Sequence, residues 1–403
     1  MEKQPVLDFA TDFDHTDPTW VADPYAVMED LRDRCPIAHS ERYGGMWVPV
    51  LQKDVAAIAN DTEHFTSRNI IVNNGRPGED APPAPIGVAP PISSDPPFHA
   101  IARHLLLSAF APKPINALEG YSVELCSSLL DAMGDRNEID AATEYTQHIP
   151  VALIAKMLGL PPEDGDLFRE FVHIIIEGVD LPVEERIAAF APIEQYLSAV
   201  IDDHRLNPRE DLTSYLLNAE IAGQPLLPEH VFGTMVLLVV AGIDTTWSAI
   251  GSSLWHLANN PEDLARIVAD PELLPAAIEE FLRAYAPVTM ARLVKEDFEF
   301  EGCPMKADDW VLLSFPAANR DPEFFDRANE VVIDREINRH SAFGLGIHRC
   351  LGSNLARLEM NVAIASFIER FPKFEIADSA GVTFSQGQVR GPRTLPIRIL
   401  ERA

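Results

Sequence analysis

Cysteine is scarce in this sequence of 403 residues. The four cysteines, Cys35, Cys126, Cys303 and Cys350, are widely scattered, and no two of them form a CxxC pair. This spacing argues against a disulfide framework and against a structural zinc site. It fits a reducing compartment, so we expect a cytoplasmic protein.

Basic residues are also few. The chain has 32 Lys and Arg against 62 Asp and Glu, a formal net charge of −30, so nucleic acid and anionic membrane surfaces would repel it. The longest apolar run, from Val231 to Ile243, is shorter than the roughly 20 residues that a membrane span needs. The first 20 residues lack the basic start and apolar stretch of a signal peptide. We expect no nucleic-acid binding and no membrane attachment.

Hydrophobic residues make up 47% of the chain, enough to bury a large core, and we expect residues 1–403 to form one domain. Apolar residues recur at intervals of three and four in most segments, which indicates helices. The clearest predicted helices are 54–60, 114–133, 150–158, 193–203, 228–258 and 273–285. Strand-like alternation is confined to 46–51, 298–301, 310–314, 374–376 and 395–400. The sequence therefore predicts a mainly α fold with small β-sheets, an α+β class.

One segment, residues 73–97, is rich in proline, which disfavours regular structure. A loop of this length inside a compact domain is typical of a lid or a binding loop. A disordered linker is the alternative.

The longest predicted helix begins at Pro228, a favoured first-turn residue, and is apolar on nearly every face, which is typical of a helix at the centre of a large protein. Its middle nevertheless reads AGIDTT, with Asp244 and Thr245. A buried carboxylate is costly unless it is paired. Helix physics leaves two interpretations open. Either the threonine bonds back to a carbonyl one turn earlier, or the helix opens here to hold a ligand, with an acid and a hydroxyl that pass protons.

The segment 343–352 reads FGLGIHRCLG. From the composition of the chain, the chance that the pattern FGxGxHxCxG occurs anywhere in it is on the order of one in a million. Gly344 and Gly346 suit a tight turn with positive φ, and Gly352 allows a close approach. The following residues have a helical pattern, so Cys350 is expected near a helix N-terminus, which favours a thiolate. A nucleophile paired with His348 is one interpretation. A thiolate ligand to heme iron, with Phe343 shielding the sulfur, fits the glycines better.

With these motifs the chain resembles the cytochrome P-450 superfamily in its soluble bacterial form, the heme-thiolate monooxygenases. The resemblance rests on AGIDTT at 241–246, Glu280-x-x-Arg283, DPPFHAIAR at 95–103 and FGLGIHRCLG, which follow the order and spacing of the family. It implies the cytochrome P-450 fold, with the long central helix lying over heme b (iron protoporphyrin IX).

The resemblance also implies roles for individual residues. Cys350 would be the iron ligand, and Asp244 and Thr245 would be the catalytic pair that relays protons during oxygen activation, where Ala241 and Gly242 mark an opening of the helix. Four residues would hold the heme propionates: His99, Arg103, Arg292 and His348. Met290 departs from relatives that place a polar residue at this position. A buried ion-pair network would have a structural role: Glu280, Arg283 and Arg335.

The resemblance implies a mostly apolar substrate pocket, made of Ile86, Val88, Leu237, Val240, Ala241, Val288, Met290, Phe315 and Val389, to which Asn73, Asn74 and Arg390 could add a polar contact. The substrate would be a small-to-medium hydrophobic compound, hydroxylated or dealkylated with one oxygen atom of O2. Two rivals are a heme-thiolate protein that uses peroxide or catalyses a rearrangement, and a non-catalytic heme sensor. We expect a monomer.

The chain shows no glycine fingerprint or cysteine spacing of a flavin or iron–sulfur reductase. Electrons would therefore come from a separate ferredoxin and ferredoxin reductase. Residues 335–358 carry four arginines, Arg335, Arg339, Arg349 and Arg357, and one acid, Glu336, a local charge of 4 − 1 = +3. This reversal of sign predicts a dock for an acidic ferredoxin.

Overall fold

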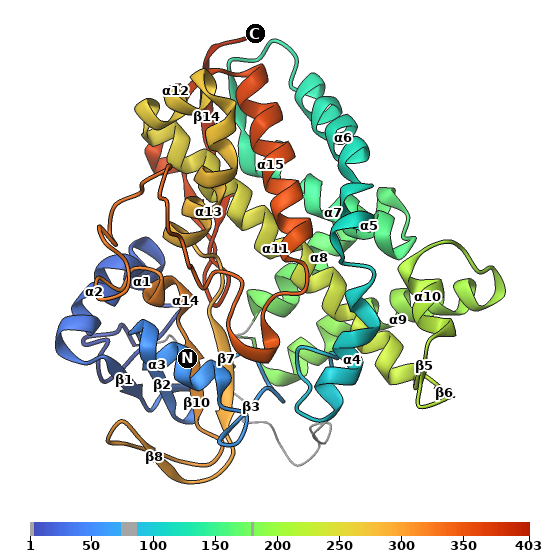
Figure 1. Ribbon diagram of the computed structural model, residues 1–403, viewed down its shortest axis with the longest axis vertical. Coiled ribbons are helices and arrows are strands. Elements are labelled where there is room, and N and C mark those ends of the chain that lie inside the picture. Colours follow the sequence, from blue (N-terminus) through green and yellow to red (C-terminus); the bar gives the residue numbers. More distant parts are fainter. Residues whose placement is uncertain (1–3, 74–86, 179–180) are drawn as a thin grey trace.

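The computed structural model describes residues 4–73, 87–178 and 181–403, so Asn74 and most of the proline-rich segment lie outside the described residues. Helices fill most of the molecule, and the main sheet lies at one side of it (Figure 1). The mainly α prediction with small sheets is confirmed. The α-helices are α1 Pro18–Ala22, α2 Pro24–Arg34, α3 Gln52–Asn60, α4 Phe98–Leu107, α5 Pro112–Asn116, α6 Glu119–Ala132, α7 His148–Leu158, α8 Gly165–Ile176, α9 Val183–Leu206, α10 Leu212–Asn218, α11 Pro228–Asn259, α12 Pro261–Ala269, α13 Leu274–Ala284, α14 Phe315–Ala318 and α15 Ser353–Arg370.

The strands form two larger sheets and three hairpin-like pairs. The five-stranded sheet has the order β1 Ile37–Ser40, β2 Met46–Pro49, β10 Trp310–Leu313, β7 Met290–Val294 and β3 Phe65–Thr66. Only the β2 and β10 pair in it is parallel. The three-stranded sheet is antiparallel, with the order β11 Lys373–Ile376, β14 Pro396–Glu401 and β4 Glu138–Asp140. The pairs are β5 Glu220–Ile221 with β6 Gln224–Pro225, β8 Phe298–Phe300 with β9 Cys303–Met305, and β12 Thr383–Phe384 with β13 Pro392–Thr394.

Two predicted helices differ from the structure. The single helix predicted over 114–133 is wrong, because the chain forms α5 and α6 with a break at Ala117 and Leu118. At Leu118 the amide donates to the carbonyl of Ile115, three residues back, which interrupts the α-helical ladder. The helix predicted over 193–203 is only the middle of α9, which runs from Val183 to Leu206.

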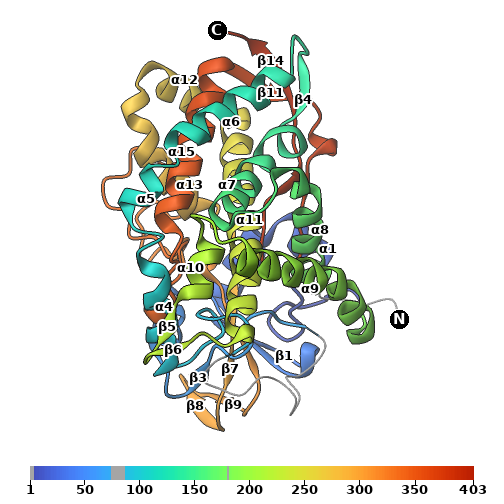
Figure 2. The ribbon, with the colours of Figure 1, turned by 90° about the vertical axis from the view of Figure 1, so that its right-hand side faces the viewer.

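Helix α11 has 32 residues and runs through the middle of the molecule in both views (Figures 1 and 2). It packs against α7, α8, α9 and α15. It is long and apolar enough to cross a membrane by length and composition, yet 61% of its most apolar window is buried inside the protein. Such burial is what a core helix requires, since an all-round apolar surface must be covered.

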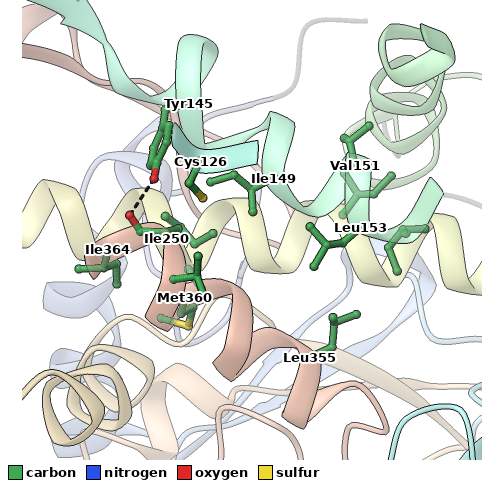
Figure 3. Packing of buried hydrophobic residues seen from close by; sticks show 14 of the residues in the cluster. Cys126, Tyr145, Ile149, Val151, Leu153, Ile250, Leu355, Met360 and Ile364 are labelled. Carbon is green, nitrogen blue, oxygen red and sulfur yellow. Dashed lines mark hydrogen bonds between the residues drawn. The ribbon is translucent and has the colours of Figure 1, made fainter. Parts of the chain in front are cut away.

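The largest hydrophobic core joins α7, α11 and α15 (Figure 3). Ile149 of α7, Ile250 of α11 and Met360 of α15 meet there with Cys126 of α6. The one polar atom of Tyr145 in this core is satisfied, because its hydroxyl donates to the carbonyl of Ala363 at 2.8 Å. This packing fixes α15 relative to α11, and therefore fixes the segment that precedes α15.

An ion-pair network holds the chain that leads to residues 343–352. The Glu280 carboxylate accepts from the Arg283 guanidinium at 2.8 Å and from the Arg335 Nε at 2.9 Å, and both Glu280 and Arg283 are fully buried. Arg283 also donates to the carbonyls of Asn319 and Ala328. Asn319 in turn accepts the amide of Ser341. The network therefore ties α13 to the loop that ends in the cysteine segment.

Replacing Glu280 with glutamine is expected to lower the free energy of unfolding by about 3 kcal/mol or more, since it leaves two desolvated guanidinium groups uncompensated. Burial raises the pKa of Glu280, but Arg283 and Arg335 outweigh it, so the pKa is lowered. Its contribution to stability is therefore present above the ordinary glutamate pKa and lost as the pH falls below it. Denaturant unfolding at several pH values measures both effects. Glu330→Gln, in an exposed pair with Arg327, is the control and should change little.

Candidate active site

A cavity of about 210 Å³ lies between the middle of α11 and the segment 343–352. Its walls are mostly apolar, with polar atoms at a few points. The predicted site residues that line it are His99, Arg103, Ala241, Gly242, Thr245, Arg292, Phe343, Gly344, His348, Cys350 and Gly352. Residues from α4, α11, β7 and the approach to α15 thus converge on one space.

The cysteine segment forms a tight loop. Gly344 and Gly346 have φ values of +71° and +66°, as predicted for these positions. The amide of Cys350 donates to the carbonyl of Phe343 at 2.7 Å and closes the turn. Cys350 stands two residues before Gly352, the N-cap of α15. Burial raises the pKa of its thiol, and the Gly352 amide together with the Arg103, Arg349 and Arg357 guanidinium groups offsets this only in part.

Across the cavity, α11 presents Ala241, Gly242 and Thr245. The predicted opening of the helix is absent, since α11 is helical throughout and the Thr245 hydroxyl donates to the carbonyl of Ala241 at 2.8 Å. A Cβ at Gly242 would lie 2.4 Å from the Cδ1 of Ile154, so a glycine is needed here for α7 to approach. The open space over this stretch comes from small side chains rather than from a broken helix.

Asp244 does not line the cavity. Its side chain is 1% exposed and points to another side of α11, where its Oδ1 lies 2.8 Å from the Nη2 of Arg393. Burial raises the pKa of Asp244 to about 6, with Arg393 opposing this shift and Glu177 adding to it. Asp244 and Thr245 are adjacent in sequence, but of the two only Thr245 lines the cavity.

Four cationic or titratable side chains gather at one edge of the cavity. The rings of His99 and His348 lie 4.4 Å apart. Arg292 is buried and its guanidinium donates to the carbonyl of Ala291, while Arg103 donates to the carbonyl of Arg349. Neither guanidinium forms an ion pair within the described residues.

These groups disfavour one another's charge. Burial lowers the pKa of Arg292 to about 10. Burial, then Arg292, His99 and Arg103, lower the pKa of His348 to about 2. The Nε2 of His99 is buried without a hydrogen-bond partner in the part of the chain that the structure describes. The Asp95 carboxylate opposes the lowering of the pKa at Arg292 and His99, but it forms no ion pair with Arg292 or Arg103 within the described residues, so a bound anionic group would supply a closer partner.

A family model described as Cytochrome P450 matches residues 137–388 of the chain. The chain belongs to the cytochrome P450 family. It is a heme-thiolate monooxygenase, the enzyme class that this family supports.

Relatives of this P450 cover most of its length. The polyketide biosynthesis cytochrome P450 PksS of Bacillus subtilis is 34% identical over 288 residues, 71% of each chain. The nocardicin C N-oxygenase of Nocardia uniformis subsp. tsuyamanensis is 33% identical over 379 residues, 92% of this chain and 93% of that one. The crystal structure of CYP109E1 from Bacillus megaterium in complex with testosterone has a TM-score of 0.86 at 31% identity, covering 94% of this chain and 98% of that one.

The residues present fit the heme that the family implies. Cys350 lines one wall of the cavity, and small side chains leave room on the α11 wall. Arg103 and Arg292 at the edge form no ion pair within the described residues, and their guanidinium groups suit the two carboxylates of a porphyrin. The fit rests on Cys350, Arg103 and Arg292, which line the P450 cavity, and on the buried Nε2 of His99, which has no hydrogen-bond partner within the described residues.

The predicted substrate residues divide among several places. Leu237, Ala241, Val288 and Met290 line the P450 cavity. Phe315 also lines it, but its Cζ is 3.6 Å from the position of a Cβ on Gly344, so it packs on the cysteine loop. Val88 and Val240 line a second, neighbouring cavity instead, which also contains Leu237. Val389 lines neither and is buried in a bridge with Val288, and Ile86 lies outside the described residues.

Of the predicted polar contacts, Arg390 does not reach either cavity, because its guanidinium donates to the carbonyl of Val21. The Nδ2 of Asn73 donates to the carbonyl of Ile71.

Sequence reasoning missed several groups around the site. The Ser67 hydroxyl lies 2.9 Å from the Nε2 of His348. Asp95 accepts the Ser67 amide at 3.0 Å and the Thr66 hydroxyl, and so ties β3 to the start of α4. Arg393, which pairs with Asp244, lies 149 positions further along the sequence. The short polar stretches 66–67 and 392–394 carry no motif that signals these contacts.

Proposed function

We propose that this P450 inserts one oxygen atom of O2 into a small-to-medium hydrophobic substrate, by hydroxylation or dealkylation. The observation that carries this proposal is one cavity that is lined by Cys350 on one wall, by Thr245 on the other and by Arg103 and Arg292 at its edge. Bound heme b (iron protoporphyrin IX) supplies the redox-active iron at which dioxygen is reduced.

Different residues of the chain are proposed to bind the iron and the propionates of the heme. The Cys350 sulfur is proposed as the iron ligand, shielded by Phe343 and approached closely past Gly344 and Gly352. His99, Arg103, Arg292 and His348 are proposed to hold the two propionates, which would supply anionic partners to side chains whose charged forms are disfavoured by burial. Binding of the heme would thus stabilise both the propionates and the four side chains that hold them.

Proton delivery is proposed to use Thr245 and Asp244. The Thr245 hydroxyl now donates to a backbone carbonyl, so it has to rotate to donate its proton into the cavity. Asp244, with a pKa of about 6, can exchange a proton near neutral pH. Thr245 lines the cavity, whereas Asp244 lies on another side of α11. In this proposal Asp244 is the proton donor, and it lies outside the cavity.

Substrate binding is proposed at the apolar wall made by Leu237, Ala241, Val288 and Met290, next to the second cavity that Val240 and Val88 line. Phe315 is reassigned to the heme side of the site because it packs on the cysteine loop. CYP109E1, of the same fold, has been crystallised with testosterone, which supports an apolar substrate of moderate size.

Electrons are proposed to come from a ferredoxin and a ferredoxin reductase, but the predicted dock needs correction. Arg335 is held by Glu280, and Arg357 is held by Glu279, with Nε to Oε1 at 2.6 Å. Their charges are therefore largely neutralised within the protein. Exposed Arg339 and Arg349 keep a free guanidinium within the described residues, so Arg349, next to Cys350, is the stronger contact.

Reversing the charge of Arg349 with Arg349→Glu is expected to slow reduction of the iron by a ferredoxin about tenfold at low ionic strength. The difference should shrink as salt is added. Stopped-flow reduction kinetics measure it, with Lys373→Glu as a control of equal charge change on β11. Equal rates for Arg349→Glu and the unmodified protein would contradict this docking surface.

The remaining proposals concern the whole protein. We propose one domain over residues 1–403, a monomer in the cytoplasm, and no interaction with nucleic acid or membrane. The net charge of −30 supports the absence of binding to nucleic acid and to membranes, since both are usually anionic.

The proposed function is tested by NADH-dependent oxygen uptake with a ferredoxin system and a panel of apolar compounds, preselected by their shift of the iron spin state. Product formation that matches the oxygen consumed is the expected result. Turnover only with peroxide, or rearrangement without oxygen uptake, would instead favour the first rival. Compounds that bind without any turnover would favour a sensor.

A further inference from the structure

A second feature of α11 concerns the groups that surround Asp244 on the side away from the cavity. Arg393, on β13, reaches Asp244 through its Nη2 at 2.8 Å and Glu177, the C-cap residue of α8, through its Nε at 2.7 Å. The three side chains come from distant parts of the sequence and are 1%, 16% and 14% exposed for Asp244, Arg393 and Glu177. One guanidinium therefore serves two carboxylates.

The position of Arg393 is fixed on several sides. Its guanidinium carbon lies 4.4 Å over the ring of Trp247, and its Nη1 donates to the Ser248 hydroxyl at 3.3 Å. A Cβ at Gly391 would lie 2.3 Å from the Cβ of Ser248, so only glycine lets this strand approach α11 so closely. The guanidinium thus has little freedom to follow either carboxylate.

The pair with Asp244 is a contact of poor geometry. Although Nη2 and Oδ1 are 2.8 Å apart, neither carboxylate oxygen of Asp244 has a well-aligned hydrogen bond within the described residues. The bond from Arg393 to Glu177 is well formed by comparison. A buried carboxylate without aligned donors is costly, and Arg393 therefore stabilises the carboxylate of Asp244 less than that of Glu177.

Glu177 also connects this pair to the surface. Its Oε2 lies 3.7 Å from the Nδ1 of His173, one turn earlier in α8, whose side chain is 70% exposed. The charged groups that act on Asp244 are thus Arg393 from β13 and Glu177 and His173 from the end of α8. Arg393 acts on both carboxylates through its position and its charge.

We propose that Arg393 and Glu177 are positioning residues for Asp244: Arg393 holds the carboxylate and favours its charged form, and Glu177 weakens that hold by competing for the same guanidinium. This inference rests on the proposed role of Asp244 in proton delivery. It predicts opposite effects from two neighbouring substitutions. Removing the competitor gives Arg393 to Asp244 alone, whereas removing the guanidinium leaves two carboxylates side by side.

The first test needs no turnover. The protonation of Asp244 is followed by infrared pH titration of the resting, heme-loaded protein, with its carboxyl band assigned by its loss in Asp244→Asn. Glu177→Gln is expected to lower the pKa of Asp244 by about one pH unit, and Arg393→Met to raise it by at least about as much. Arg393→Lys, which keeps the charge, should stay closest to the unmodified protein. Unchanged values, or shifts in the same direction for Glu177→Gln and Arg393→Met, would overturn the inference.

The second test separates this inference from the proposed function. The pH profile of coupled product formation should move with the spectroscopic pKa in each variant. If the infrared pKa values shift in opposite directions while the profiles stay unchanged, Arg393 and Glu177 do control Asp244, and the role of Asp244 in proton delivery is wrong. If the infrared values do not shift, the inference fails whatever the profiles do. Thermal unfolding of each variant verifies that it is folded.

Discussion

Replacing Cys350 with alanine is expected to abolish the carbon monoxide spectrum that thiolate-ligated ferrous heme gives, and to lower monooxygenase turnover by about three orders of magnitude or more. The cavity, the cationic edge and α11 do not depend on the sulfur, so heme should still enter, held by its propionates. Absorption spectroscopy of the reduced protein under carbon monoxide measures the first effect, and product formation measures the second.

Cys303→Ala is the matched control, because Cys303 lies on β9, away from the cavity, and is similarly half-buried. It should keep both the spectrum and the activity. Circular dichroism shows whether Cys350→Ala retains its helices. A folded Cys350→Ala protein with an unchanged thiolate spectrum would mean that another residue is the ligand.

Replacing Thr245 with alanine is expected to leave substrate binding intact while coupled product formation falls at least about tenfold, the scale of a lost proton-transfer group. Oxygen and NADH would still be consumed, with hydrogen peroxide as the main product. Thr245 and the neighbouring Thr246 are the two threonines of the AGIDTT stretch that line the cavity. The Thr245 hydroxyl donates to the carbonyl of Ala241, one turn earlier in α11, and we propose that this hydroxyl passes the proton.

Thr245→Ser keeps the hydroxyl and should retain most of the coupling. The substrate-induced shift of the iron spin state measures binding, and the ratio of product to oxygen consumed measures coupling. Normal coupling in Thr245→Ala would remove this residue from the proton path and leave the hydrogen bond to Ala241 as its only role.

The parts of the site that the sequence predicted are those specified by adjacent residues. The glycines and Cys350 of the segment 343–352 determine a tight loop by local geometry, and the structure has the predicted positive φ values there. The apolar surface of residues 228–258 predicted a central helix, and α11 matches it closely. The local conformation of a turn and the apolar pattern of a helix can both be read from a single segment.

The parts that the sequence did not predict depend on contacts between distant segments. Helix physics left an open and an unbroken α11 equally possible, and the unbroken helix accompanies the close approach of Ile154 from α7 to Gly242. The pairing of Asp244 with Arg393 and Glu177 joins three elements, and nothing near Arg393 in sequence marks it. The arginine surplus at 335–358 misled in the same way, since Glu279 and Glu280 of α13 neutralise two of the four charges.

The central claim is that the Cys350 sulfur binds the heme iron from the wall opposite Thr245. Iron K-edge X-ray absorption of the ferric protein tests it most directly, because it reports the atoms bonded to the metal. The account predicts one sulfur scatterer at bonding distance beside the porphyrin nitrogens, and its loss in Cys350→Ala. An iron shell of nitrogen and oxygen alone in the unmodified protein would contradict it.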